Sequence, residues 1–169
     1  MRRRDDDRFY EFAVGNSSRL YRAACLLTTG DTHLAEDLVQ EALGRMYTVW
    51  HRRKSIDNPS AYAQTVLARC YLGHARLRSS TEEPIVELPD RAVDATDSPL
   101  RVTLLRALAA LSPKDRTVLV LRFWEDRSIE QTAEAMRTSS SAVRTRTSRA
   151  LARLRVELGT SDLAELAAL

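Results

Sequence analysis

Residues 139–155 read SSSAVRTRTSRALARLR, a stretch with five arginines and no carboxylate. At roughly 100° per residue of an α-helix, its apolar side chains share one face, whereas Arg146, Arg149 and Arg153 lie on nearly the opposite face. Ser139 has the side chain of an N-cap. The pattern predicts a helix that packs on one side and presents arginine on the other. The apolar set is Val143, Ala150, Leu151, Leu154 and Leu158.

A short helix is predicted just before this one, separated from it by the tight turn RTS. Its N-cap is Ser128, and Gln131 completes a capping box. A short capped helix, a turn and a longer basic helix are typical of a helix-turn-helix, in which the start of the second helix faces base edges and later arginines reach phosphates. The predicted DNA-contacting residues are Ser140, Ser141, Arg144, Thr145, Arg146, Arg149 and Arg153.

Two more helices precede this pair. LLRALAAL, near Leu100, is an apolar helix that stops at SPKD, where Ser112 is the expected N-cap, Pro113 the first helical residue and Asp115 a first-turn carboxylate. RTVLVLRFW continues as the next helix. Residues 99–158 are therefore predicted to form one helix-turn-helix domain.

The N-terminal part is predicted to contain four helices between about Arg8 and His74, because apolar residues recur there at helical spacing. TTGD supplies a glycine stop and then Asp31 as an N-cap, and DNPSAY ends one helix and starts the next. The predicted organisation is a domain over residues 1–75, an acidic linker over 76–98, the domain over 99–158 and a tail over 159–169.

Composition and charge support this division. Alanine, leucine, arginine and glutamate are abundant and β-branched alternation is rare, which favours an all-α fold. The linker carries six carboxylates against three arginines and lacks a sustained period, so we expect a flexible tether between two small helical domains. Residues 99–169 carry 12 basic against 8 acidic side chains, which points to an anionic partner for the C-terminal part.

Several function classes are disfavoured. Cys25 and Cys70 lie in apolar helical patterns without CxxC spacing, so we expect buried thiols and neither a disulfide nor a zinc site. His33, His51 and His74 have no evident nucleophile partner, and no glycine-rich phosphate loop is present, so we expect no enzyme, metal or cofactor. No apolar run suits a signal peptide or a membrane span, so we expect a cytoplasmic protein without membrane insertion.

The residues also carry a resemblance to a known family. The run from LLRALAALSPKDRTVLVLRFWEDRS to RTRTSRALARLR resembles the C-terminal domain of extracytoplasmic-function sigma factors, and LLTTGDTHLAEDLVQEALGRMYTVW resembles their first conserved domain. The chain is therefore identified as a member of this family, of the SigE-like actinobacterial type. The resemblance implies a sigma2-like domain and a sigma4-like domain that bind core RNA polymerase, at its beta-prime clamp helices and beta flap, and direct it to promoter DNA.

The resemblance also implies roles for particular residues. The stretch AEDLVQEA would dock on the clamp helices, and the contacting side chains at i, i+3 and i+4 share one helical face. The segment after it would recognise the minus-ten element, the helix-turn-helix would recognise the minus-thirty-five element, and the acidic linker would thread the RNA exit channel. The implied polymerase contacts are Asp37, Gln40 and Glu41; the implied minus-ten contacts are Arg52, Arg53, Lys54, Asn58, Arg69, His74 and Arg76.

Some positions depart from the family pattern. Arg69 stands where asparagine is frequent, and Ala75 replaces an expected arginine. In the recognition turn, Arg137 and Ser141 stand where glycines are usual. We expect a different helix cap there, because a non-glycine residue at positive φ costs about 1 kcal/mol.

Three alternatives stay open from the sequence. A stand-alone helix-turn-helix regulator would bind a near-palindromic duplex without polymerase. An adaptor that binds only proteins would be insensitive to salt, unlike DNA contacts by arginine. An enzyme has the weakest support. Whether an anti-sigma factor is a partner is also left open.

Overall fold

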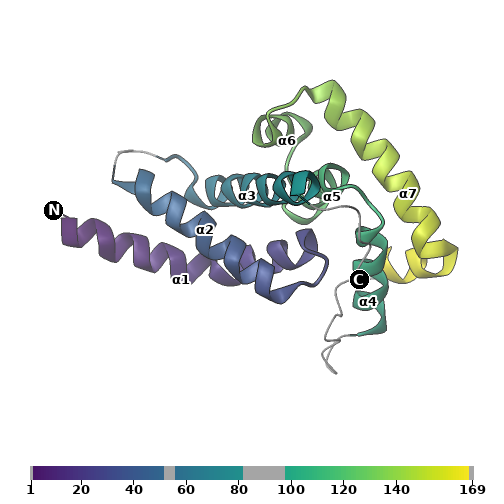
Figure 1. Ribbon diagram of the computed structural model, residues 1–169, viewed down its shortest axis with the longest axis horizontal. Helices are drawn as coiled ribbons and strands as arrows, with labels where there is room; N and C mark the ends of the chain where they lie inside the picture. The colour runs from purple at the N-terminus through teal and green to yellow at the C-terminus, as the bar shows by residue number, and fades with distance from the viewer. Residues whose placement is uncertain (1, 52–55, 82–97, 168–169) are drawn as a thin grey trace.

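The structure describes residues 2–51, 56–81 and 98–167, and there the chain consists of helices joined by short turns (Figure 1). This computed structural model has no strand in those ranges, so the predicted all-α fold is confirmed. Helices α1–α3 pack on one another and form the N-terminal bundle; α4–α7 form the C-terminal bundle. The elements are α1 (Arg2–Leu27), α2 (Thr32–Trp50), α3 (Pro59–Thr81), α4 (Pro99–Ala109), α5 (Pro113–Leu119), the π-helical turn η1 (Val120–Trp124), α6 (Ile129–Met136) and α7 (Ser140–Ala167).

Helix α1 is one 26-residue helix where two were expected, so the prediction of four N-terminal helices is wrong: the described N-terminal bundle has three. Gly15 lies mid-helix with open space around its Cα. Asn16 and Ser17 donate side-chain hydrogen bonds to the backbone oxygens of Phe12 and Ala13, the former at 2.9 Å. Because these bonds return to the preceding turn, the polar residues do not interrupt the helix.

Side-chain caps fix the helix starts as the sequence predicts. Asp31, Ser112, Ser128 and Ser139 each accept a hydrogen bond from the backbone N–H three residues on, at 3.0–3.2 Å. Gln131 completes the capping box by accepting from the Ser128 N–H at 3.0 Å. These local bonds define where α2, α5, α6 and α7 begin, independently of tertiary packing.

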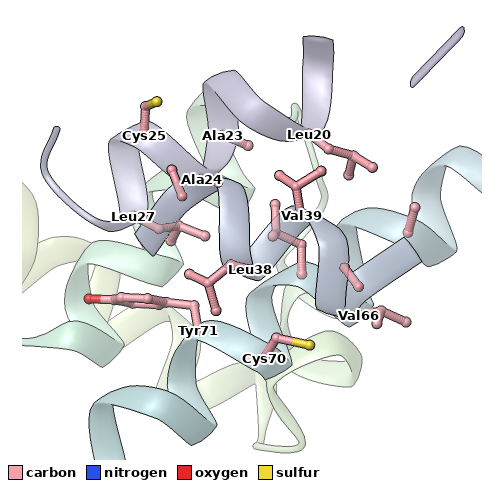
Figure 2. Packing of buried hydrophobic residues seen from close by; sticks show 14 of the residues in the cluster. Leu20, Ala23, Ala24, Cys25, Leu27, Leu38, Val39, Val66, Cys70 and Tyr71 are labelled. Carbon is pink, nitrogen blue, oxygen red and sulfur yellow. The ribbon is translucent and has the colours of Figure 1, made fainter. Parts of the chain in front are cut away.

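The N-terminal core is filled by side chains from all three helices of the N-terminal bundle. Figure 2 shows Leu27 of α1, Leu38 of α2 and Tyr71 of α3 directed into one interior, and each is at most 4% exposed. Cys25 and Cys70 are buried free thiols, as predicted. Burial raises the pKa of the Cys70 thiol to about 11, so this sulfur stays protonated at neutral pH.

The two bundles contact each other in this structure. Helix α3 packs against α5 and α6 (Figure 1). Helix α1 packs against η1. Val120 of η1 joins the N-terminal core, and Ala68, Leu121 and Ala135 form a small buried cluster between the bundles. The predicted linker over residues 76–98 is wrong at its start, because residues 76–81 continue α3. Its remaining part, residues 82–97, lies outside the described residues.

Candidate nucleic-acid interface

Helices α6 and α7 form the predicted helix-turn-helix pair, and the chain reverses at Arg137. This residue has φ 53° and ψ 50°, the left-handed conformation. The Thr138 N–H donates to Ala133 O at 3.0 Å and the Arg137 N–H donates to Glu134 O at 3.2 Å, which is the Schellman pattern. The expectation of a different cap is therefore wrong: an arginine occupies the conformation that glycine adopts at lower cost.

Helix α7 has the amphipathic face that the sequence predicts. Val143 and Ala150 are fully buried, Val143 against Val118 and Ala133. The side chains at the start of α7 and along its arginine face point away from that core. Ser141, Arg144, Thr145, Arg149 and Arg153 are exposed, and Ser140 and Arg146 are half-buried.

Two of these arginines bind the carboxylate of Asp115, a pairing that the sequence did not predict. Asp115 Oδ1 accepts hydrogen bonds from Arg146 Nη1 at 2.9 Å and from Arg149 Nη2 at 3.3 Å. Burial opposes ionisation of Asp115, but the two arginines outweigh it, and the pKa of this carboxyl lies below its ordinary value. Arg146 and Arg149 therefore tie α7 to α5, whereas Arg153 has no such bond within the described residues.

The predicted polymerase-docking residues share one exposed face of α2. Asp37, Gln40 and Glu41 are exposed, and Glu41 forms an ion pair with Arg45 at 2.6 Å. The opposite face of α2 enters the core. Its buried residues are Ala35, Leu38, Val39, Ala42 and Met46.

The predicted minus-ten residues are spread along α3. Asn58 Oδ1 caps that helix by accepting from the Ala61 N–H at 3.0 Å, and Arg76, 18 positions further on, lies roughly 27 Å away along the helix at 1.5 Å per residue. His74 is half-buried and Arg76 is exposed. The remaining members, Arg52, Arg53 and Lys54, lie outside the described residues.

Arg69, another predicted minus-ten contact, points at the C-terminal bundle. Its Nε donates to Ala135 O at 2.9 Å and its Nη2 donates to Glu134 O at 3.2 Å. Burial lowers the pKa of this guanidinium. In the closed arrangement seen here, Arg69 thus hydrogen-bonds to the backbone of α6.

A basic cleft of about 780 Å³ lies between α3 and the helix-turn-helix. It brings Arg69 and Arg76 together with Arg146, and also with Lys114 and Arg137, two cations that sequence reasoning did not assign. None of the described residues that line it is a carboxylate. Lys114 lies in the first turn of α5 and Arg137 in the turn after α6. A single cation at either position does not indicate a function in the sequence.

The described ranges show neither a membrane-spanning helix nor a metal-binding cluster. None of their helices combines the length and hydropathy that a bilayer span requires. In those same ranges, no three histidine, cysteine or acidic side chains lie close enough together to hold a metal ion.

Each of the two bundles matches a known protein family. Residues 14–81 match the family described as Sigma-70 region 2, and residues 101–154 match Sigma-70, region 4. The chain is 38% identical over 157 residues to the RNA polymerase sigma-E factor of Streptomyces coelicolor, covering 92% of this chain and 88% of that protein. It is 41% identical over 131 residues to the sigma-E factor of Streptomyces antibioticus, covering 76% and 73%.

A solved structure has the same fold. The sigma factor RpoE of Bartonella quintana, in complex with the anti-sigma factor NepR, superposes with a TM-score of 0.71 at 23% identity, covering 89% of this chain and 96% of that one. Region 2 coincides with α1–α3 apart from the start of α1, and region 4 with α4 to the middle of α7. The chain therefore belongs to the RNA polymerase sigma factors, as a sigma-E-like member of the extracytoplasmic-function type.

Proposed function

We propose that this sigma factor docks on core RNA polymerase through the exposed face of α2 and contacts promoter DNA through α3 and α7. The chain is a sigma factor that directs transcription initiation. One observation supports the residue assignments. In each family region, one helix has a polar face that is not packed in the core: the exposed face of α2 and the start of α7.

The polymerase contact is assigned to Asp37, Gln40 and Glu41. Their side chains are exposed on one face, while the other face of α2 is fixed in the core. A rigid helix can present such a set without reordering, which favours docking. The beta-prime clamp helices are the proposed partner of this face, and the beta flap is the proposed partner of the C-terminal bundle.

The minus-thirty-five contact is assigned to the first turns of α7. Ser141, Arg144 and Thr145 are exposed there, where a recognition helix meets base edges. Arg153, two turns further on, would contact phosphate. Ser140, Arg146 and Arg149 complete the proposed set, with the two arginines oriented by Asp115.

The minus-ten contact is assigned to α3 and the segment before it. The described members are Asn58, Arg69, His74 and Arg76, and Arg52, Arg53 and Lys54 belong to the same proposal although they lie outside the described residues. The acidic linker would occupy the RNA exit channel. By similarity to the Bartonella quintana protein, an anti-sigma factor is a candidate partner, and the site of action would be the cytoplasm.

Holoenzyme assembly tests the docking face. The variant Glu41→Lys should bind core polymerase at least tenfold more weakly than the wild type, because it reverses a charge on the docking face. Glu11→Lys is the matched control, since Glu11 is exposed on α1 and outside this face. Equal loss of binding in both variants, or no loss in either, would contradict the assignment.

A further inference from the structure

The basic cleft between α3 and the helix-turn-helix gathers cations from three helices and a turn. Arg69 and Arg76 come from α3, Lys114 from α5 and Arg146 from α7, and Arg137 is the turn residue between α6 and α7. No carboxylate lines this cleft within the part of the chain that the structure describes. Because like charges that converge without a counter-charge repel one another, the cleft is suited to an anion.

Most of this positive charge is not neutralised by the protein. Arg76, Lys114 and Arg137 are exposed, and their side chains make no hydrogen bond or ion pair with another described residue. Arg69 donates only to backbone oxygens, which carry no net charge. Burial lowers the pKa of Arg69, and repulsion by Arg137 acts in the same direction. Three side chains are therefore available to bind an anionic ligand, and a fourth adds to its attraction.

Apolar side chains line the same cleft. They are Leu72 and Ala75 of α3 and Ala135 and Met136 of α6, and all four are buried or half-buried. The exposed cations therefore form the rim, and the apolar side chains lie deeper. Sites for small molecules usually have volumes of roughly 300–1,000 Å³, a largely apolar lining and a few charged groups. The cleft, at about 780 Å³, has the size and the lining of such a site.

The two walls of the cleft are held in place by hydrogen bonds outside it. Arg127, which follows η1, donates to Thr65 Oγ1 at 2.8 Å and to Gln64 Oε1 at 3.2 Å. Arg116 of α5 donates to Tyr71 Oη at 2.7 Å. All three acceptors belong to α3, so the α3 wall is fixed against the wall formed by α5 and α6. A cleft that is already formed loses little conformational entropy when a ligand binds.

The combination of a cationic rim and an apolar interior defines the chemistry of the ligand. Guanidinium groups pair with phosphate oxygens through two parallel hydrogen bonds, and lysine binds phosphate as a point charge. Several cations on one rim favour a ligand with more than one phosphate. The apolar interior favours a flat, weakly polar group, on which a guanidinium can also stack. A nucleotide with a chain of phosphates has both parts, whereas inorganic polyphosphate lacks the second and a fatty acid lacks the first.

We propose that the basic cleft is a binding site for a nucleotide that carries two or more phosphates. Arg76, Lys114 and Arg137 hold the phosphates, and the base lies against Leu72 and Met136. The site goes beyond the proposed function and does not depend on it, because Lys114 and Arg137 belong to neither set of proposed promoter contacts.

Isothermal titration calorimetry on the full-length protein tests the site, with ATP as the probe in magnesium-free buffer. Tripolyphosphate and adenosine represent the two halves of the ligand. ATP should bind about tenfold more tightly than tripolyphosphate, because its base buries apolar surface. Adenosine should not bind in the same concentration range, and raising the salt concentration should weaken both anions. Equal affinity for ATP and tripolyphosphate overturns the proposal, because the site then recognises phosphate alone, and so does the absence of saturable ATP binding.

Variants on the two walls locate the bound nucleotide. Arg76→Gln on one wall, and Lys114→Gln or Arg137→Gln on the other, should each weaken ATP binding about tenfold, the effect of losing one charge-assisted hydrogen bond. Arg137→Lys keeps the charge and should retain most of the affinity. Arg106→Gln is the matched control, since Arg106 is exposed on α4 and does not line the cleft. A loss confined to one wall, or an equal loss in the control, overturns the proposal.

Thermal unfolding followed by circular dichroism separates loss of the site from loss of the fold. ATP should raise the melting temperature of the wild type and of Arg106→Gln, because a ligand that binds only the folded chain stabilises it. Arg76→Gln and Lys114→Gln should keep the helical content of the wild type and lose this rise. A full rise in either variant overturns the proposal. If the chain gives no promoter-specific initiation with core polymerase, the proposed function fails while the ATP titration still decides the site.

Discussion

Asp115 of α5 lies 2.9 Å from Arg146 of α7 and holds an arginine that belongs to the proposed recognition helix. The same carboxylate oxygen also accepts from Arg149 at 3.3 Å. The orientation of α7 is thus fixed by core packing of its apolar face and by the hydrogen bonds of its arginine face to Asp115. This pairing has a consequence for stability.

Removing this charge should lower stability at neutral pH. Asp115→Asn is expected to cost about 1–2 kcal/mol at pH 7, because it weakens two charged hydrogen bonds whose arginines stay partly solvated. Because the folded-state pKa of Asp115 is below its ordinary value of 3.8, its contribution is present above pH 3.8 and is lost as the pH falls through the folded-state pKa. Urea unfolding at several pH values measures the difference, with Glu157→Gln on exposed α7 as the control. A difference that does not shrink in acid would contradict the pairing.

The arginines of α7 should differ in their effect on promoter binding. Arg144→Ala should cost about 1–3 kcal/mol and relax sequence preference at one base pair, whereas Arg153→Ala should weaken binding to all sequences and reduce the salt slope by about 1. Holoenzyme binding to matched and mismatched promoters over a range of salt concentrations separates the two. Arg106→Ala on α4 is the control. Identical effects of the two changes on specificity would argue against the assigned roles.

The recognition turn should become more stable with glycine. Arg137→Gly is expected to raise the free energy of unfolding by about 0.5–1 kcal/mol, because glycine adopts φ 53° without the steric cost that a side chain carries. Arg137→Ala keeps the Cβ and should show no such gain, so it serves as the matched control for the loss of charge. A gain with alanine equal to that with glycine would mean that charge repulsion in the basic cleft, and not backbone strain, is relieved.

Glu125 should respond to pH in the opposite sense to Asp115. Burial raises the pKa of Glu125 above its ordinary value of 4.5, with Arg19 opposing the shift. The contribution of Glu125 to the free energy of unfolding is therefore fully present below pH 4.5 and is lost as the pH rises through the folded-state pKa. Glu125→Gln should consequently equal or exceed the wild type in stability at pH 7, by up to about 1 kcal/mol, and lose that advantage near pH 4. Thermal unfolding at both pH values checks this, with Glu11→Gln as the control; marked destabilisation at pH 7 is the opposing result.

Features governed by neighbours in the sequence were predictable. The caps at Asp31, Ser112, Ser128 and Ser139 each involve a bond to the third residue onward, and the buried face of α7 follows from helical period alone. The continuity of α1 was missed because its middle holds glycine, asparagine and serine, which often end helices but here bond back to the preceding turn.

Features governed by distant partners were not predictable. From the sequence, Arg146 is predicted to be a cation on the exposed face of its helix. Its partner Asp115 lies 31 positions earlier and is brought to it only by the fold. Arg69 reads as a DNA contact, yet it bonds to backbone oxygens 65 and 66 positions away. Arg116 and Arg127 give no signal in the sequence, because five of their seven hydrogen-bond acceptors lie 45 to 89 positions away.

Run-off transcription with purified core RNA polymerase and fragments of the source genome tests the central claim most directly. The account predicts that adding this chain yields initiation at discrete promoters, and that the chain alone binds the same fragments at least a hundredfold more weakly than the assembled holoenzyme does. Tight, sequence-specific binding to a duplex by the chain alone, with no polymerase-dependent initiation from any fragment, would contradict it.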